Sequence, residues 1–219
     1  MIVVTISGRG QTAGAPAGTE NPALQIWNET QVVQPLSKSR DLVIIGGLRI
    51  GQGLRRPIDE RIGAGLGFKV RRYLTLQPTY MFVAYQPFPG REFTEHRAVF
   101  NATLKFHAGR FTLTDRNLIE RRIRPSGRDF STYRNRLMID HPAKLGSLKF
   151  NPFISNEVWY TTQPIASGNF GWSRNRFAVG VLKQFSPHFY AEVMFLRQND
   201  GISRPGDINS VMTVFRYTL

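Results

Sequence analysis

The four histidines are the residues of this sequence that could serve the most chemical roles, because an imidazole can act as a base, bind a metal or orient a nucleophile. His96 has no serine close to it, whereas His188 has Ser186 two residues before it. His107 and His141 lie in short segments rich in turn residues. A serine–histidine hydrolase needs a nucleophile, a base and an orienting group that converge. The spacing does not indicate such a site, and we expect no catalytic residue.

Metal and cofactor sites find no support either. The chain has no cysteine, which excludes disulfides and thiolate ligands, and its four histidines are scattered. The glycines of GLGFKVRR, residues 65–72, lack the strand-to-helix context of a phosphate-binding loop. We therefore expect no metal and no cofactor.

Arginine dominates the charge of the chain. The net charge is +14, from 29 basic and 15 acidic residues, and only six of the basic residues are lysines. The planar guanidinium group of arginine can bridge carboxylates in a fixed geometry, so this bias predicts paired arginines rather than a loosely solvated surface. The charged residues that we expect to pair are Glu95, Arg97, Arg116, Glu120, Arg134, Arg136, Glu157, Arg174, Arg176 and Glu192.

These charges occur in segments where apolar and polar residues alternate, which is the period of a β-strand. The clearest segments are residues 61–70, 73–85, 95–106, 147–160 and 174–185. Their lengths, roughly ten to fourteen residues, suit tilted strands that cross a bilayer. No apolar run approaches the roughly 18 residues of a membrane-spanning helix.

Turn-rich segments separate the strands, and they alternate between two kinds. The short kind comprises residues 35–41, 69–73, 106–110, 142–147 and 185–188. The kind that is longer or richer in glycine and proline comprises residues 53–57, 86–92, 124–129, 163–169 and 199–207. Short periplasmic turns alternating with longer outer loops are typical of an outer-membrane barrel. The pattern predicts an all-β, antiparallel up-and-down transmembrane β-barrel.

The strand count leaves the parity open. Eleven strands are expected between about residue 25 and the end of the chain, whereas single-chain bacterial barrels usually have an even number. Residues 2–7 also alternate, so residues 1–21 form either a first strand with its loop or the remnant of a leader. We expect about twelve strands, with ten as the alternative, and a barrel over residues 22–219.

The alternation also suits a soluble sandwich or a lipocalin-like barrel with its apolar face inward. Two features favour the membrane barrel: the polar face carries paired charges suited to a crowded lumen, and aromatic residues gather toward strand ends. These aromatic residues are Tyr73, Tyr85, Phe88, Phe106, Phe111, Phe130, Phe150, Trp159, Tyr160, Trp172, Phe185, Phe189 and Tyr217.

One segment, residues 111–124, fits the inside-out pattern poorly. Placing Arg116, Glu120 and Arg122 in the lumen turns Asp115 and Asn117 toward lipid. A β-bulge could restore the register.

The last nine residues, VMTVFRYTL, alternate strictly. We expect Phe215, Tyr217 and Leu219 to face lipid and to form the C-terminal signal read by the barrel-insertion machinery, with Arg216 in the lumen.

Five stretches resemble a family of bacterial outer-membrane β-barrel proteins known as domain of unknown function 2490. They are QIWNETQVVQPLSKSRDLVIIGGLRI, STYRNRLMI, NPFISNEVWY, WSRNRFAVGV and FLRQNDGISRPGDINSVMTVFRYTL. The resemblance covers about residues 25–219. It implies an outer-membrane β-barrel and supplies no activity.

We therefore expect a non-enzymatic outer-membrane barrel, either a narrow anion-preferring channel or a structural barrel with a charged lumen. Its expected partners are outer-membrane lipids, lipopolysaccharide and the insertion machinery, and a monomer is favoured. One alternative is an outer-membrane enzyme acting on lipid or lipopolysaccharide. Another is a soluble basic β-barrel that binds nucleic acid, which we disfavour because the aromatics fall on the apolar face rather than among the arginines.

Overall fold

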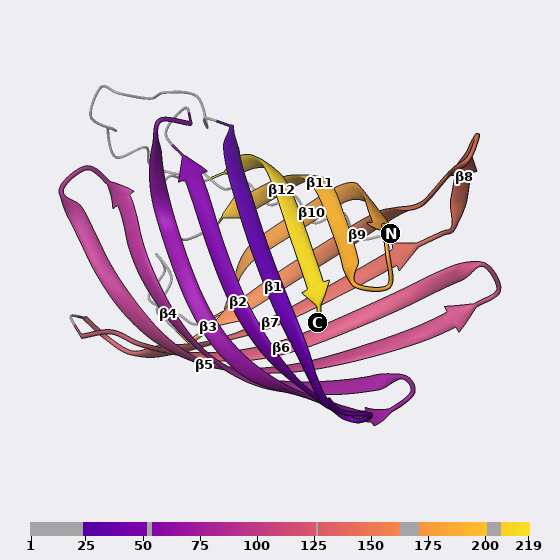
Figure 1. Ribbon diagram of the computed structural model, residues 1–219. Coiled ribbons are helices and arrows are strands. Elements are labelled where there is room, and N and C mark those ends of the chain that lie inside the picture. Colours follow the sequence, from indigo (N-terminus) through magenta and orange to yellow (C-terminus); the bar gives the residue numbers. More distant parts are fainter. Residues whose placement is uncertain (1–23, 52–53, 126, 163–170, 201–206) are drawn as a thin grey trace, which may run out of the picture.

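The computed structural model describes residues 24–51, 54–125, 127–162, 171–200 and 207–219, which form strands joined by turns (Figure 1). The described residues include no helix that is both long and apolar enough to cross a membrane. The strands are β1 (Gln25–Ser37), β2 (Arg40–Gly51), β3 (Arg56–Arg71), β4 (Leu74–Phe88), β5 (Arg91–Ala108), β6 (Phe111–Ile123), β7 (Phe130–Asp140), β8 (Ala143–Leu145), β9 (Leu148–Thr161), β10 (Gly171–Gln184), β11 (Phe189–Asp200) and β12 (Ile208–Thr218).

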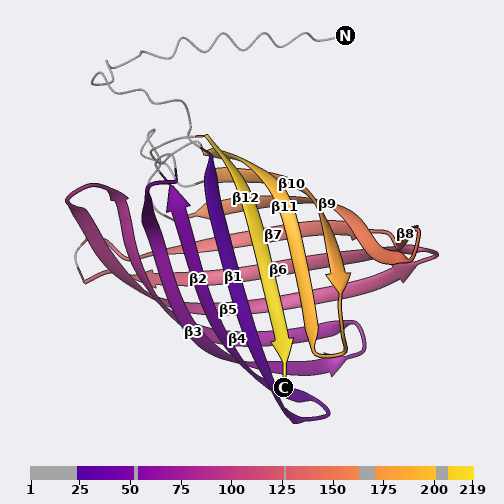
Figure 2. The same cartoon turned by 45° about the horizontal axis from the view of Figure 1, so that its top comes forward.

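Within the described residues, eleven strands close into a barrel. Neighbouring wall strands are antiparallel along the chain from β1 to β12, and the three-residue β8 pairs with the start of β9. The barrel closes where β1 meets β12, and this pair is parallel, with Gln25 opposite Ser210 and Val33 opposite Thr218. Figure 2 shows these two strands side by side, in indigo and yellow.

The fold class expected from the sequence is confirmed. The eleven strands expected from about residue 25 onward are the eleven wall strands, and β8 brings the number in the described residues to twelve. The parity argument assumed antiparallel closure, which requires an even number of strands. Parallel pairing of β1 with β12 closes an odd number instead. The further strand expected at residues 2–7 lies outside the described residues.

The connections sort into two ends of the barrel. Tight turns join β1 to β2, β3 to β4, β5 to β6 and β10 to β11, and Gly109 takes the positive φ of +60° that such a turn needs. We call this the turn end, and the opposite end, where β1 begins, the loop end. One loop-end connection is shorter than the sequence suggests, because β4 and β5 continue into a two-residue turn at Pro89 and Gly90, with φ +72° at Gly90.

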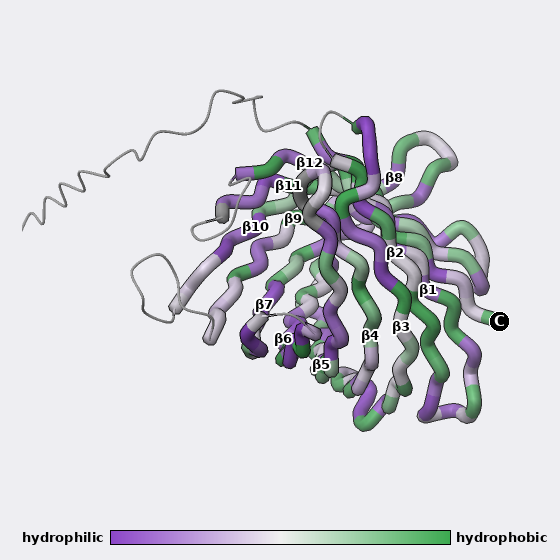
Figure 3. Tube along the Cα trace, turned by 90° about the vertical axis from the view of Figure 1, so that its left-hand side faces the viewer, coloured by the Kyte–Doolittle hydropathy of each residue, from purple (hydrophilic) through white to green (hydrophobic). Residues whose placement is uncertain are grey.

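The apolar side chains of the wall point outward. On β10, Phe177, Val179 and Val181 are 42–47% exposed, whereas Ala178 between them is 3% exposed. Figure 3 shows hydrophobic and hydrophilic residues alternating along the strands. Exposed apolar residues on the other strands include Ile44, Ile62, Leu66, Tyr80, Phe100, Ile119, Leu137, Ile154, Val193 and Phe195.

Apolar side chains also form two clusters on the inner face of the barrel. One contains Val33, Val43 and Ile45 of β1 and β2, with Met81 of β4 packed against them. The larger one gathers residues from β1 and from β7 to β12: Trp27, Met138, Phe153, Ala178, Met194, Leu196 and Ile208. Part of the barrel interior is therefore filled by apolar packing.

The wall between β3 and β4 is packed too tightly for a side chain at Gly65. A Cβ atom there would lie 2.6 Å from the backbone oxygen of Pro78 and would also clash with Oγ1 of Thr79. Only glycine fits, since real Cβ atoms do not approach other atoms so closely. The backbone contact between β3 and β4 at this level thus depends on Gly65.

Candidate functional site

Strand alternation brings the charged side chains to the inner face of the barrel. β7 and β10 each carry an Arg-Asn-Arg triplet, which turns both arginines inward and the asparagine outward. The strand register then aligns neighbours: Arg136 lies opposite Arg116 and Glu157, and Glu157 lies opposite Arg176. One row across β6, β7, β9 and β10 therefore holds three arginines and one glutamate.

Glu157, the single carboxylate of this row, pairs with three arginines. Its Oε1 accepts hydrogen bonds from Nη2 of Arg134 at 2.8 Å and Nη2 of Arg116 at 2.9 Å. Its Oε2 accepts one from Nη1 of Arg176 at 3.3 Å. Glu157 is 5% exposed, so its charge is stabilised by guanidinium groups rather than by water.

Three strands repeat an acidic residue and an arginine two positions apart. This spacing puts both side chains on the same face of a strand, where they pair directly. The pairs are Asp59 with Arg61 on β3, Glu95 with Arg97 on β5, and Glu120 with Arg122 on β6.

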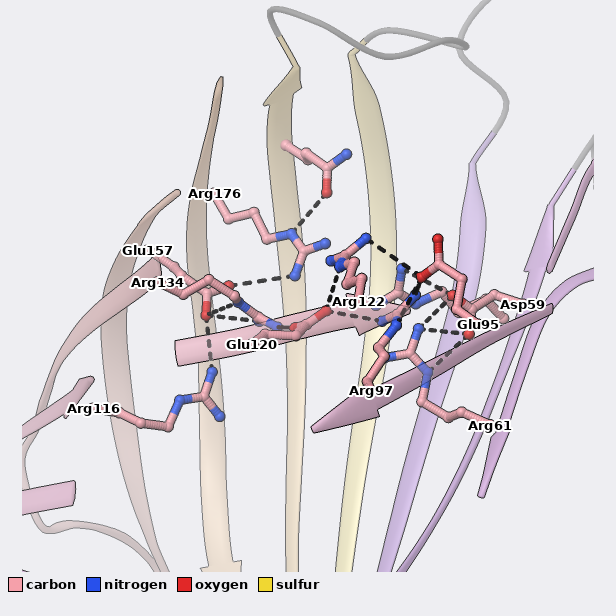
Figure 4. A network of polar contacts seen from close by, with 12 residues as sticks. Asp59, Arg61, Glu95, Arg97, Arg116, Glu120, Arg122, Arg134, Glu157 and Arg176 are labelled. Carbon is pink, nitrogen blue, oxygen red and sulfur yellow. Dashed lines mark hydrogen bonds and ion pairs between the residues drawn. The ribbon is translucent and has the colours of Figure 1, made fainter. Parts of the chain in front are cut away.

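Arginines connect the pairs on β5 and β6 to each other and to Glu157 in one network (Figure 4). Arg97 lies 2.6 Å from Glu95 and 3.4 Å from Glu120. Arg134 lies 3.7 Å from Glu120 and 2.8 Å from Glu157. Arg124, just beyond β6, donates to Glu95 at 2.7 Å. The contacts thus run without a break from β5 through β6 and β7 to β9 and β10.

Two tryptophans extend the network across the barrel. The guanidinium of Arg176 on β10 lies 4.4 Å from the ring centre of Trp159 on β9 and 4.9 Å from that of Trp27 on β1. Arg49 of β2 covers Trp27 at 4.1 Å, and also lies 3.7 Å from Asp59 of β3. Such cation–π stacks gain strength when they are withdrawn from water. Two strands, β11 and β12, lie between β10 and β1 in the wall, so this stack spans part of the lumen.

Positive charge exceeds negative charge in the network. Each of its four carboxylates touches at least two guanidinium groups, and eight arginines against four carboxylates leave an excess of four positive charges. The carboxylates are Asp59, Glu95, Glu120 and Glu157, and the arginines are Arg49, Arg61, Arg97, Arg116, Arg122, Arg124, Arg134 and Arg176.

The remaining candidates from the sequence lie beside this network. Arg174 stacks over Trp159 at 4.2 Å, and Arg136 lies 3.9 Å from Glu192 of β11. The ten charged residues expected to pair therefore all face inward and all contact an opposite charge or an aromatic ring.

Sequence reasoning missed four members of the network: Asp59, Arg49, Arg61 and Arg124. Arg122 was placed in the lumen but was not among the residues expected to pair. A signal for Asp59 and Arg61 was present, since the acid-x-Arg spacing of β3 matches that of β5, where both residues were identified. Arg49 and Arg124 lie at strand ends that no repeated pattern marks.

Three aromatic residues assigned to the membrane interfaces were placed wrongly. Trp159 and Phe130 are 5% and 6% exposed and lie inside the barrel, where arginines stack on both rings. Tyr85 pairs in register with Asp59 and Phe93, and its ring contacts Phe93 at 4.9 Å. Alternation is hard to follow at strand ends, and a bulge between Trp172 and Arg174 shifts the register beside Trp159.

The four histidines have separate surroundings. His96 faces outward, where the hydroxyl of Tyr80 contacts its Nδ1 at 2.5 Å, while the adjacent Glu95 is buried inside. At the turn end, His188 Nδ1 lies 2.7 Å from the backbone oxygen of Thr218. His107 contacts Oγ1 of Thr112 at 3.3 Å, and His141 packs on Phe111. No described serine hydroxyl approaches a histidine ring in a hydrogen bond, and the described residues contain no group of three metal-binding side chains.

On the last strand, Arg216 lies between two aromatic residues and is exposed at the turn end. Phe215 packs on Phe189 of β11 at a ring distance of 6.1 Å, and Tyr217 lies 6.4 Å from the ring of His188. Tyr217 and Leu219 are 46% and 57% exposed. The backbone nitrogen of Leu219 donates to the oxygen of Val33 at 2.9 Å, which fastens the end of the chain to β1.

Comparison with known proteins identifies the family of the chain. The family model described as "protein of unknown function (DUF2490)" matches residues 24–208, which is nearly the whole barrel. The chain belongs to this family. The DUF2490 resemblance noted in the sequence is thereby confirmed. No curated protein matches the chain. Among solved structures, the DUF2490 chain is similar to LpxR from Salmonella typhimurium, with 9% identity, a TM-score of 0.49, and coverage of 81% of this chain and 83% of that one.

Proposed function

We propose that this chain is a non-enzymatic β-barrel of the bacterial outer membrane, whose charged side chains fill the lumen and hold it closed. Of the two non-enzymatic options, the burial of the network favours the structural barrel over the channel. Glu95, Glu157 and Arg176 are 1%, 5% and 6% exposed. In a water-filled pore, inward-facing charges are hydrated instead.

The outer face supports membrane insertion. Exposed valine, leucine, isoleucine and phenylalanine side chains cover it on nearly every strand. A soluble monomer rarely exposes a contiguous apolar surface of more than a few hundred Å². Covering this belt with lipid chains removes the apolar side chains from water while the inner charges stay paired.

Aromatic pairs at both ends of the wall fit the two interfaces of a bilayer. Tyr73 stacks on Phe106 at 5.9 Å at the turn end. Tyr160 meets Trp172 edge-on at 5.6 Å at the loop end. Amphipathic rings favour the headgroup level, so these pairs would bracket the hydrocarbon layer.

The excess of arginine supports a preference for anions in any residual current. Nε of Arg116, Nη2 of Arg176 and Nε1 of Trp159 are buried donors without a hydrogen-bond partner among the described residues. A water molecule or a small anion would satisfy them. The buried acceptors without a hydrogen-bond partner are Oδ1 of Asn101 and Oε2 of Glu192, so unpaired donors outnumber unpaired acceptors by three to two among the described residues.

The alternatives have less support. Glu95 and His96, the first residues to consider for a lipid-cleaving enzyme, lie on opposite faces of β5. Two tryptophans do stack with arginines, contrary to the reason given above against nucleic acid. However, Trp27 and Trp159 are 2% and 5% exposed inside the barrel, where no base could stack on them.

The partners that we propose contact three parts of the barrel: the outer wall, the loop end and the C-terminal strand. Lipid chains contact the outer face, and the exposed Arg55 and Arg128 at the loop end can meet lipopolysaccharide phosphates. The C-terminal strand is the segment that the insertion machinery would read.

Planar-bilayer conductance tests the closed lumen. The unmodified protein should show no discrete current steps, whereas a Trp27→Ala/Arg176→Ala variant should conduct in steps that favour anions, because the stack across the lumen is gone. Trp172→Ala removes a tryptophan that is 65% exposed on the outer face and should behave like the unmodified protein.

Large steps in the unmodified protein would show that the lumen is open. If the unmodified protein and the double variant both migrate as folded barrels on a gel and both show no current steps, the tryptophan–arginine stack does not close the lumen.

A further inference from the structure

A group of five polar side chains interrupts the apolar outer wall on β6, β7, β9 and β10. Asp115 and Asn117 face outward on β6, Asn135 on β7, Asn156 on β9 and Asn175 on β10. We call these five residues the wall patch. Asn117 lies directly opposite Asn135 in the strand register, so the patch crosses neighbouring strands. The outward positions of Asp115 and Asn117 need no rescue by a bulge, because β6 runs in unbroken register with β5 and β7.

Hydrogen bonds join the members of the patch to one another. Asn135 donates to Oδ1 of Asp115 at 2.6 Å and to Oδ1 of Asn117 at 3.1 Å, and Asn117 donates to Oδ2 of Asp115 at 3.2 Å. The hydroxyl of Tyr133 also donates to Oδ1 of Asn117, at 2.6 Å. Asn156 and Asn175 exchange two amide hydrogen bonds, at 3.4 and 3.1 Å. An amide has two donor and two acceptor sites, so these contacts still leave the oxygen of Asn135 and one N–H each of Asn117, Asn156 and Asn175 for a partner.

The patch sits at the middle of the wall. Asn117 is the seventh of the thirteen residues of β6, and Asn135 is the sixth of the eleven residues of β7. Exposed apolar residues lie above and below, with Ile119 at 58% and Ile139 at 38% exposure. In a membrane, this depth corresponds to hydrocarbon, where lipid headgroups do not reach and lipid chains offer no hydrogen bonds.

We propose that the wall patch is the contact surface between two copies of this chain in the membrane. The proposal rests on the membrane placement proposed above. A two-fold interface brings a surface against itself, so it must be self-complementary. Asparagine meets that requirement because its amide both donates and accepts, as the reciprocal pair of Asn156 and Asn175 already illustrates.

The apolar neighbours of the patch complete the interface. Leu137 lies opposite Asp115 on one side and Asn156 on the other, and is 43% exposed. Ile154 beside it is 51% exposed. Such side chains would pack around the polar centre and exclude lipid from it. The patch thus favours a dimer over the monomer expected from the sequence.

Disulfide cross-linking tests the dimer, because the chain has no cysteine of its own. Leu137→Cys places one thiol at the centre of the patch, and Ile62→Cys places one on β3, where Ile62 is 62% exposed. After oxidation in lipid vesicles, Leu137→Cys should migrate mainly as a dimer and Ile62→Cys as a monomer. Equal cross-linking at both sites, or none at either, would contradict the proposal.

A second variant removes the hydrogen bonds instead of adding a thiol. Asn117→Leu/Asn135→Leu should shift the mass in lipid nanodiscs from two chains to one, whereas Asn28→Leu/Thr213→Val, at a polar pair on the β1–β12 seam, should leave two chains. If the unmodified protein migrates as a heat-modifiable barrel but is a monomer, the dimer is refuted and the membrane placement stands. A chain that stays soluble without detergent refutes the membrane placement as well, and a different protein or a tightly held lipid on the patch refutes the second copy.

Discussion

At the scale of single residues, spacing determines which charges meet. An acid and an arginine two positions apart share one strand face, and β3, β5 and β6 each use this device. Longer contacts then depend on register, as where Arg116 reaches Glu157 across β7. Burial increases the loss of stability when one partner is removed, because a buried charge without its counterpart is not hydrated by water.

Glu157→Gln should therefore destabilise the barrel strongly. The variant keeps the shape of the side chain but leaves Arg116, Arg134 and Arg176 without the carboxylate that they share. Breaking a buried ion pair by removing one partner costs about 3–5 kcal/mol of unfolding free energy. Equilibrium unfolding in urea, in lipid vesicles, measures the difference.

The matched control is Glu60→Gln, since Glu60 is exposed on β3. It should change the free energy by less than about 0.5 kcal/mol. Equal effects of the two substitutions would mean that the inner network does not stabilise the fold.

Gly65 offers a test of backbone packing between β3 and β4. Gly65→Ala puts a Cβ atom 2.6 Å from the oxygen of Pro78, so the strands must separate, at a cost of about 1–3 kcal/mol. Gly46→Ala on β2 is the control, because a Cβ atom there meets nothing within 4 Å. Thermal unfolding followed by gel migration compares the two. A larger loss for Gly46→Ala would contradict the close approach.

At the scale of the strands, the sequence predicted where the strands lie better than it predicted which strands pair to close the barrel. Period-two alternation in residues 174–185 located β10, because its apolar residues Phe177, Val179 and Val181 all face outward. Which strands meet at the seam could not be predicted, since pairing of β1 with β12 joins residues about 185 positions apart. Local patterns contain no information about that contact, and the usual even strand number pointed away from the parallel pair.

The last strand has a predicted role in assembly as well as in closure. Phe215→Ser/Tyr217→Ser should slow insertion severalfold, because both aromatics lie on the outward face that the insertion machinery would read. Arg216→Gln changes the residue between them, on the other face, and should leave the rate nearly unchanged. Assembly into vesicles that contain purified insertion machinery can be timed by the gel shift. If Arg216→Gln slows insertion as much as the aromatic pair does, the outward face is not the signal.

At the scale of the whole molecule, the decisive question is which face of the wall is apolar. Apolar and polar residues alternate in both a soluble barrel and a membrane barrel, and the sequence distinguished the two mainly by the charges gathered on one face. The aromatic pattern was a weaker guide, since Trp159 and Phe130 proved to lie among the inner arginines. Their neighbours in space belong to other strands, so no local rule could have assigned them.

Nitroxide scanning of residues 177–182 on β10 tests the inside-out barrel most directly. Single cysteines can be labelled cleanly because the chain has none. In lipid vesicles, labels at Phe177, Val179 and Val181 should be readily reached by oxygen, which concentrates among lipid chains, and labels at Ala178, Gly180 and Leu182 should be shielded. The opposite phase, or strong access of a water-soluble relaxing agent to residues 177, 179 and 181, would contradict a membrane barrel with its charges inside.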